Sequence, residues 1–286
     1  TIPEQLEQPA SRILASHGHW DHFSGLSHLA SSLNLDVLAV KEQIPAISSK
    51  KRYMTYFRAG NQFSAHPAAT LTRQGKRIRE ILVKKAFTTI FGLDFYRGPV
   101  TLINPDNDLI INGQAWQVIA LPGHSDDDIA LYNEQRGILL SGDILLNAVT
   151  TWIGPPRSDL TRYLNSLERL KQLPCLTLIL PAHGRPITDP LNRIDQAISH
   201  RKKRTERLFL LIQSAGKKGI MYEHIIHHFY PKVPRFQKSI FEGWVCVTLD
   251  FLLDRHYIAS RINNGQTCFQ AVRQLEPDAF EKQDKK

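Results

Sequence analysis

Four side chains with metal-binding chemistry lie within six residues, in the stretch His17-Gly18-His19-Trp20-Asp21-His22. Imidazole nitrogens and carboxylate oxygens are the groups that hold zinc in proteins. A polar loop that is only incidentally rich in histidine would rarely place so many of these groups together. We therefore interpret this stretch as a metal-binding loop.

Further candidate ligands share one setting, a polar turn that directly follows an apolar segment. The apolar run 13–15 precedes the first motif, and short apolar segments precede Pro122-Gly123-His124, Ser141-Gly142-Asp143 and Ala182-His183-Gly184. The strand-end candidates are His17, His19, Asp21, His22, His124, Asp143 and His183. This set is too large for one tetrahedral zinc ion, but it suits two metal ions that share a carboxylate.

The elements that must position these residues alternate between short strands and helices. The pattern predicts helices over 24–32 and 159–172, the latter with Asp159 as N-cap, and strands over 35–40, 129–132, 137–140 and 176–180. A hairpin is predicted over 108–119 around Asn112-Gly113. Residues 41–71 are expected to be irregular, and 72–91 to form a basic amphipathic helix.

The C-terminal third has a different pattern, with three helices and then a hairpin. The helices are predicted from 199 through 212, over about 222–229 and over about 237–254, and the hairpin pairs 257–261 with 267–272 around Asn264-Gly265. This order is typical of a winged helix. We predict three parts: residues 1–190 with a basic insertion at about 41–97, a winged-helix-like unit at 191–275, and a charged tail at 276–286.

The formal net charge of +9 is concentrated in two regions. Residues 41–97 carry 12 Lys and Arg against 3 Asp and Glu, and residues 200–286 carry 16 against 9. An anionic partner and a set of solvated helix faces both explain this pattern. Three widely separated cysteines, the lack of a visible signal peptide and the lack of a long apolar run lead us to expect an intracellular, cytoplasmic protein with no membrane partner.

The four motifs, taken in order, resemble those of the metallo-β-lactamase superfamily. The resemblance implies an αββα sandwich, abbreviated at its N-terminus because only 16 residues precede His17. It also implies that His17, His19 and His124 hold one metal ion, that Asp21, His22 and His183 hold another, and that Asp143 bridges them. Two Zn²⁺ ions are expected, with iron or manganese able to use the same ligands.

A finer resemblance covers nearly the whole chain. Gly123 to Asp127, Tyr163 to Leu167 and Ile198 to Arg201 look like the mitochondrial β-lactamase-like protein 2 group and bacterial metallohydrolases with a C-terminal winged helix. That group is associated with cleavage of single-stranded RNA. If the source is eukaryotic, the resemblance leaves a mitochondrial location open beside the cytoplasmic one.

Three functions remain open from the sequence. We expect a dinuclear zinc hydrolase that directs a metal-bridging hydroxide at a small anionic ester or thioester, with Asp21 and Asp143 orienting the hydroxide. The alternatives are a single-stranded RNA endoribonuclease and a catalytically compromised fragment or nucleic-acid-binding module. Of the acidic run Asp126–Asp128, one residue is expected to support a ligating histidine and at least two to form a solvated turn. The sequence does not predict the oligomeric state.

Overall fold

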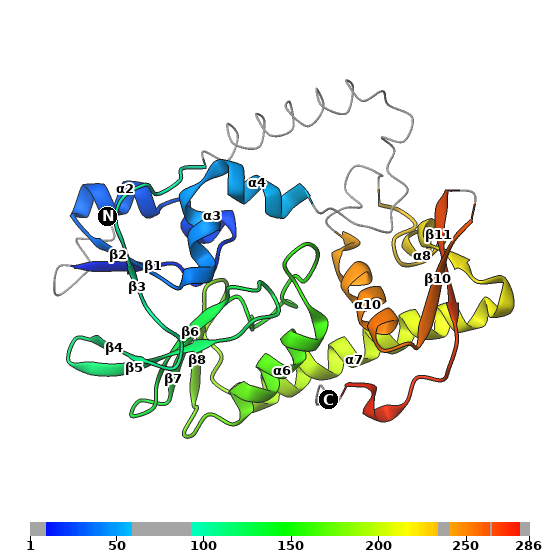
Figure 1. The fold of residues 1–286 in the computed structure, drawn as a ribbon. Coiled ribbons are helices and arrows are strands. Elements are labelled where there is room, and N and C mark those ends of the chain that lie inside the picture. Colours follow the sequence, from blue (N-terminus) through cyan, green and yellow to red (C-terminus); the bar gives the residue numbers. More distant parts are fainter. Residues whose placement is uncertain (1–9, 59–92, 234–240, 264, 281–286) are drawn as a thin grey trace.

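Two sheets lie face to face at the centre of the N-terminal two thirds of the chain (Figure 1). The structure, a computed structural model, describes residues 10–58, 93–233, 241–263 and 265–280. The first sheet is parallel, in the order β1-β2-β3, and is formed by β1 (Arg12–Leu14), β2 (Asp36–Ala39) and β3 (Val100–Leu102). The second has the order β4-β5-β6-β7-β8 and comprises β4 (Asp108–Ile111), β5 (Gln114–Ala120), β6 (Ile129–Asn133), β7 (Ile138–Gly142) and β8 (Leu178–Pro181). It is antiparallel except for the parallel pair β7-β8.

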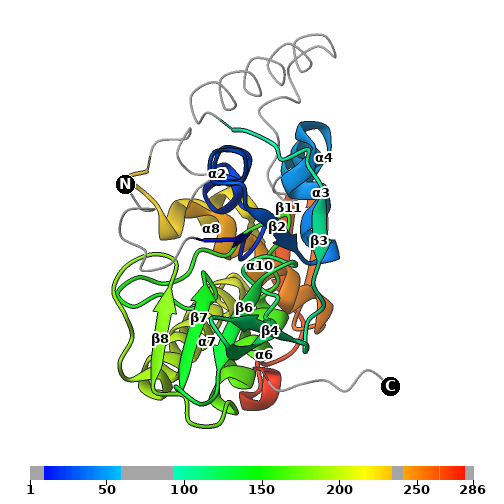
Figure 2. The ribbon, with the colours of Figure 1, turned by 90° about the vertical axis from the view of Figure 1, so that its left-hand side faces the viewer.

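Helices cover the outer face of each sheet (Figures 1 and 2). On the first sheet lie α1 (Trp20–Phe23), α2 (Leu26–Leu33), α3 (Ile44–Ser48) and α4 (Lys50–Arg58), with a 3₁₀ turn η2 (Lys41–Gln43) before α3. On the second lie α6 (Leu160–Lys171) and α7 (Pro190–Ser214). The αββα sandwich that the resemblance implies is therefore confirmed.

Alternating side chains build the separate apolar layers of this sandwich. Along β6, Ile129 and Leu131 face the first sheet, whereas Ala130 and Tyr132 face α6 and α7. Along β5, the neighbours Val118 and Ile119 divide in the same way. Successive side chains of a strand point to opposite faces. The nearly continuous apolar character of β6 follows because both faces of its sheet are covered.

The remaining elements form a C-terminal region beside α7. They are a 3₁₀ turn η4 (Gly216–Lys218), β9 (Ile220–Met221), α8 (Tyr222–Phe229), α10 (Gly243–Asp254), β10 (Ile258–Asn263), β11 (Gln266–Ala271) and a 3₁₀ turn η5 (Pro277–Phe280). The sheet order is β10-β11-β9. The helices and the hairpin follow the predicted order, and their assignment as a winged helix stays a proposal, as do the domain boundaries.

Two expectations about secondary structure were wrong. Residues 41–58 are not irregular, because η2, α3 and α4 occupy them and bury Gln43, Ile47 and Tyr53. The helix expected from 199 begins earlier, at Pro190, with Asp189 as N-cap. The predicted 72–91 helix, residues 237–240 and Asn264 lie outside the described residues. Among the described helices, none combines the length and apolarity that a bilayer crossing requires.

Gly123 has a backbone conformation that side chains rarely adopt. Its φ is +147°, and a Cβ at this position would lie 2.4 Å from the backbone nitrogen of Tyr163 in α6. The chain therefore needs glycine immediately before His124, so that the turn after β5 can lie directly on α6.

We expect Gly123→Ala to lower the free energy of unfolding by about 1–3 kcal/mol, because it adds backbone strain and a clash with α6. Denaturant titration measures this change. Gly113→Asn is the control, since Gly113 has φ +72°, no atom of the described residues lies within 4 Å of a Cβ there, and asparagine tolerates this backbone region. Equal stability of Gly123→Ala and the wild type would contradict the interpretation.

Candidate metal centre

The predicted ligands come from the ends of four strands and from one short helix. His17 follows β1, and His19 is the N-cap of α1, which carries Asp21 and His22. His124 follows β5, Asp143 directly follows β7, and His183 follows β8. The ends of β5, β7 and β8 meet at one edge of the second sheet, and the backbone bond from Ile129 N to Ser16 O ties the loop after β1 to that edge.

His17, His19 and His124 form a first triad. The Nε2 atom of His17 lies 2.9 Å from Nδ1 of His19 and 3.2 Å from Nε2 of His124. The ring planes of neighbouring histidines are nearly perpendicular, at 82° and 83° for the two pairs with His17. Ring nitrogens that converge in this way can occupy three positions around one cation.

Asp21, His22 and His183 form a second triad. The Nε2 atom of His183 lies 3.3 Å from Nε2 of His22 and 3.4 Å from Oδ2 of Asp21. In each triad the candidate ligand atoms lie within 4.8 Å of one another. The second triad is more open to solvent than the first, because the side chain of His183 is 50 % exposed, whereas His17 is fully buried.

Asp143 lies between the two triads. Its Oδ2 atom is 3.9 Å from Nε2 of His124, and 3.4 Å and 3.6 Å from Nε2 of His22 and His183. Its Oδ1 atom is buried and has no hydrogen-bond partner among the described residues. A buried carboxylate oxygen without a partner is costly. This orphaned oxygen, and the surrounding imidazole donor set, fit two cations that share Asp143.

The protonation of these groups suits cation binding. Burial lowers the pKa of His17 and His19 well below the usual value, and it also lowers the pKa of His124. Burial alone would raise the pKa of Asp143, but the hydrogen bond and charge of His22 and the charge of His124 bring it below its usual value. The imidazoles of His17, His19 and His124 are therefore neutral and the Asp143 carboxylate is ionised near pH 7, the forms that bind metals.

The comparisons with known proteins agree with this geometry. A family model described as the metallo-beta-lactamase superfamily matches residues 6–183. The chain belongs to the metallo-beta-lactamase superfamily.

Relatives in this superfamily differ in how much of the chain they match. A Bacillus subtilis protein named probable metallo-hydrolase YqjP is 26 % identical over 80 % of the chain and 70 % of its own length. A beta-lactamase-like protein 2 homolog of Caenorhabditis elegans is 32 % identical over 106 residues, which are 37 % of this chain and 34 % of the length of that relative. A beta-lactamase domain protein from Burkholderia ambifaria shares the fold, with 20 % identity and a TM-score of 0.69 over 92 % of this chain and 76 % of its own.

Outer contacts fix the orientation of several histidines in this candidate centre. Nδ1 of His124 donates to the Trp152 carbonyl at 2.6 Å, and Nδ1 of His17 lies 3.2 Å from Oδ1 of Asp128. The Ser16 hydroxyl lies 2.9 Å from Nδ1 of His22. Each contact occupies Nδ1 and leaves Nε2 directed at the centre, as is usual for metal-binding histidines.

The acidic run after His124 is mostly buried, which corrects the expectation of a solvated turn. Asp127 and Asp128 are only 3 % and 4 % exposed, and only Asp126 faces solvent. Asp128 accepts from Ser125 N and contacts His17, as one of the three was expected to do. Asp127 accepts from the backbone N–H of Gly18 and from the Ser125 hydroxyl.

Sequence reasoning missed two residues that hold the first motif. Arg157 pairs with Asp127 at 2.8 Å and with Asp126, and so fixes the carboxylate that binds the motif backbone. The fully buried Gln43 side chain donates to the carbonyls of Ala15 and Ser16, at 3.1 Å and 3.0 Å. Neither residue belongs to a recognisable motif, and Gln43 directly follows Lys41 and Glu42, so no local pattern marks it as buried.

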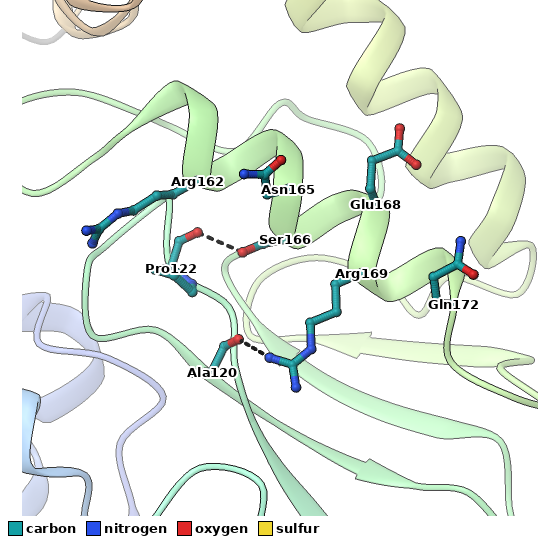
Figure 3. Close-up of a pocket in the computed structure, with 8 residues that line it drawn as sticks. All are labelled: Ala120, Pro122, Arg162, Asn165, Ser166, Glu168, Arg169 and Gln172. Carbon is teal, nitrogen blue, oxygen red and sulfur yellow. Dashed lines mark hydrogen bonds between the residues drawn. The ribbon is translucent and has the colours of Figure 1, made fainter. Parts of the chain in front are cut away.

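Helix α6 holds the loop that carries His124 from its other side. Figure 3 shows the Ser166 hydroxyl donating to the Pro122 carbonyl at 2.7 Å and the Arg169 guanidinium donating to the Ala120 carbonyl at 3.1 Å. These bonds lie along a pocket of about 570 Å³ on the outer side of the loop. The pocket is therefore a supporting surface behind the centre rather than the centre itself.

We expect Asp127→Ala to lower the free energy of unfolding by about 3–5 kcal/mol, because it leaves the buried Arg157 charge without its inner partner. Chemical denaturation measures the change. Asp195→Ala is the matched control, since the Asp195–Lys171 pair at 2.7 Å lies on the surface and should contribute less than about 1 kcal/mol. Equal losses in the two variants would refute a supporting role for the buried pair.

Proposed function

We propose that this protein is a dinuclear zinc-dependent hydrolase of a small anionic ester or thioester. The observation that carries the proposal is the convergence of seven side chains into two triads that share Asp143. His17, His19 and His124 would hold one cation, and Asp21, His22 and His183 the other. Bound cations of this type polarise the bond under attack and lower the pKa of a water.

The residues of the chain contribute orientation and exclusion of water. Asp21 and Asp143 would accept hydrogen bonds from the attacking water and so direct it. Burial of the first triad keeps bulk water from one side, while the half-exposed His183 leaves the other side open to substrate. An open ligand position is a feature of catalytic rather than structural zinc sites.

Two observations favour a small substrate over a nucleic acid. In the winged-helix interpretation α10 would be the recognition helix, yet Gly243 to Leu249, Phe251 and Leu252 are buried in the core and cannot enter a groove. An Aspergillus fumigatus relative, 26 % identical over 39 % of this chain and 36 % of its own length, is named atrochrysone carboxyl ACP thioesterase. That name supports a thioester substrate here.

We expect purified protein to bind two equivalents of Zn²⁺ per chain, measured by elemental analysis after dialysis. His183→Ala should bind one equivalent, because it removes a ligand from the second triad only. His227→Ala, an exposed histidine of α8, is the control and should keep both. Wild-type protein that binds less than one equivalent would refute the proposal.

We expect the zinc-loaded protein to hydrolyse an anionic acyl thioester and to leave single-stranded RNA intact. Asp143→Asn should lower kcat/KM at least about 100-fold, because Lewis-acid stabilisation is worth several kcal/mol and each 1.36 kcal/mol is tenfold. Thiol release and gel electrophoresis measure the two reactions. Asp108→Asn, on the exposed strand β4, is the control. Cleavage of RNA without thioester hydrolysis would contradict the proposed substrate and favour the endoribonuclease alternative.

A further inference from the structure

The segment from Leu146 to Trp152 lies between the metal centre and α7. Its last residue, Trp152, accepts the hydrogen bond from Nδ1 of His124 through its backbone carbonyl. The indole ring of Trp152 is near both His19 and His124, with ring centroids 6.2 Å and 6.4 Å away. The segment has no regular secondary structure, so other groups must determine where this carbonyl lies.

Two arginines of α7 bind the carbonyls of this segment. Arg193 donates through Nε to Leu146 O at 2.8 Å and through Nη2 to Val149 O at 3.1 Å. Arg201, two turns further along the helix, donates through Nη2 to Thr151 O, the carbonyl immediately before that of Trp152. Three carbonyls within six residues are therefore held by guanidinium groups from one helix.

The burial of Arg201 is unusual for a residue with no functional task. It is 3 % exposed, and among the described residues no carboxylate lies within ion-pair distance. Its guanidinium lies 5.3 Å from the ring centroid of Tyr163. Burial lowers its pKa to about 10, so it remains cationic at neutral pH. Burying a charge without a counter-ion is costly. The hydrogen bond to the Thr151 carbonyl offsets part of this cost and gives the guanidinium a structural role.

Helix α10 supports the far side of the same segment. Gly154 and Gly243, the first residue of α10, lie so close that a Cβ at Gly154 would be 2.9 Å from Cα of Gly243. The same Cβ would be 2.5 Å from Cζ2 of Trp152. The indole is thus held against the start of α10, and the segment is fixed from two elements of the C-terminal third.

We propose that Arg193 and Arg201 are positioning residues of the metal centre. By holding the Leu146–Trp152 segment, they place the Trp152 carbonyl so that His124 keeps its proton on Nδ1 and directs Nε2 at the first triad. The inference rests on the proposed function, because it treats His124 as a ligand. On this inference, α7 in the C-terminal third supports metal binding, a role that is independent of any contact with nucleic acid.

The test compares Arg201→Met and Arg193→Gln with the matched control Arg204→Met. Arg204 lies on the same helix, but its guanidinium stacks 3.8 Å from the Trp244 ring and bonds to the Tyr230 hydroxyl rather than to a carbonyl of the segment. Zn²⁺ affinity is measured by competition with a chromophoric chelator. Nitrogen-15 NMR of the zinc-loaded protein reports the Nδ1–H signal of His124, which is assigned by its loss in His124→Gln.

We expect Arg201→Met to raise the dissociation constant of one of the two Zn²⁺ equivalents about 10-fold to 100-fold. This effect is typical of losing an outer partner of a metal ligand. The His124 Nδ1–H signal should shift or broaden in both test variants. Arg204→Met should leave affinity and signal unchanged, even where its thermal stability falls as much. If Arg201→Met does not fold, the half-buried Arg193→Gln carries the test alone.

Unchanged affinity and an unchanged His124 signal in the folded test variants would overturn the inference. Equal changes in the Arg204→Met control would also overturn it, because they would show general loosening of α7. Wild-type protein that binds no Zn²⁺ would instead refute the proposed function, so the two failures are distinguishable.

Discussion

The convergence of imidazole and carboxylate groups on one small volume is the constraint on which the rest of the structure depends. Ring nitrogens of different histidines lie 2.9–3.3 Å apart around Asp143. Lone pairs held so close are unfavourable unless cations occupy the space between them or outer groups fix the rings. The structure supplies such outer groups to His17, His22 and His124 through Asp128, Ser16 and the Trp152 carbonyl.

A second set of buried polar side chains holds the backbone of the first motif and of the two residues before it. Asp127 and Arg157 fix the motif backbone, and Gln43 fixes the carbonyls that precede it. Buried polar networks of this kind are favourable only when their members are satisfied. The orphaned Oδ1 atom of Asp143 is the exception at the centre of the network, and it lies where cations would bind.

The C-terminal third contributes to the centre through packing as well as through charge. Residues of α7, α8 and α10 share one apolar cluster with α6 and with the second sheet. In α10, Gly243 to Leu249 are buried, so their side chains pack inside the protein. Two basic residues of this third bind groups inside the protein: Arg193 donates to the carbonyls of Leu146 and Val149, and Arg201 donates through Nη2 to the carbonyl of Thr151.

The sequence by itself predicted the seven side chains that converge at the candidate centre, the hairpin at Asn112-Gly113 and most of the strands, because these features are local. Ligand spacing within a motif, turn chemistry and apolar runs can all be identified along the chain. The sequence could not show that Asp127 and Asp128 are buried, because a run of three aspartates is usually solvated. Asp127 pairs with Arg157, 30 residues away in the chain, and Asp128 contacts His17, 111 residues away.

Only the tertiary structure decided which distant residues support the centre. Gln43, Arg157, Arg193 and Arg201 carry no motif, and each acts on backbone or carboxylate groups that folding brings to it. Such contacts join residues far apart in the chain, 50 positions from Arg201 to Thr151 and 84 from Gln43 to the carbonyl of Asp127, so no local pattern records them. The chemistry of the site is therefore specified locally, whereas its rigidity is a property of the packed fold.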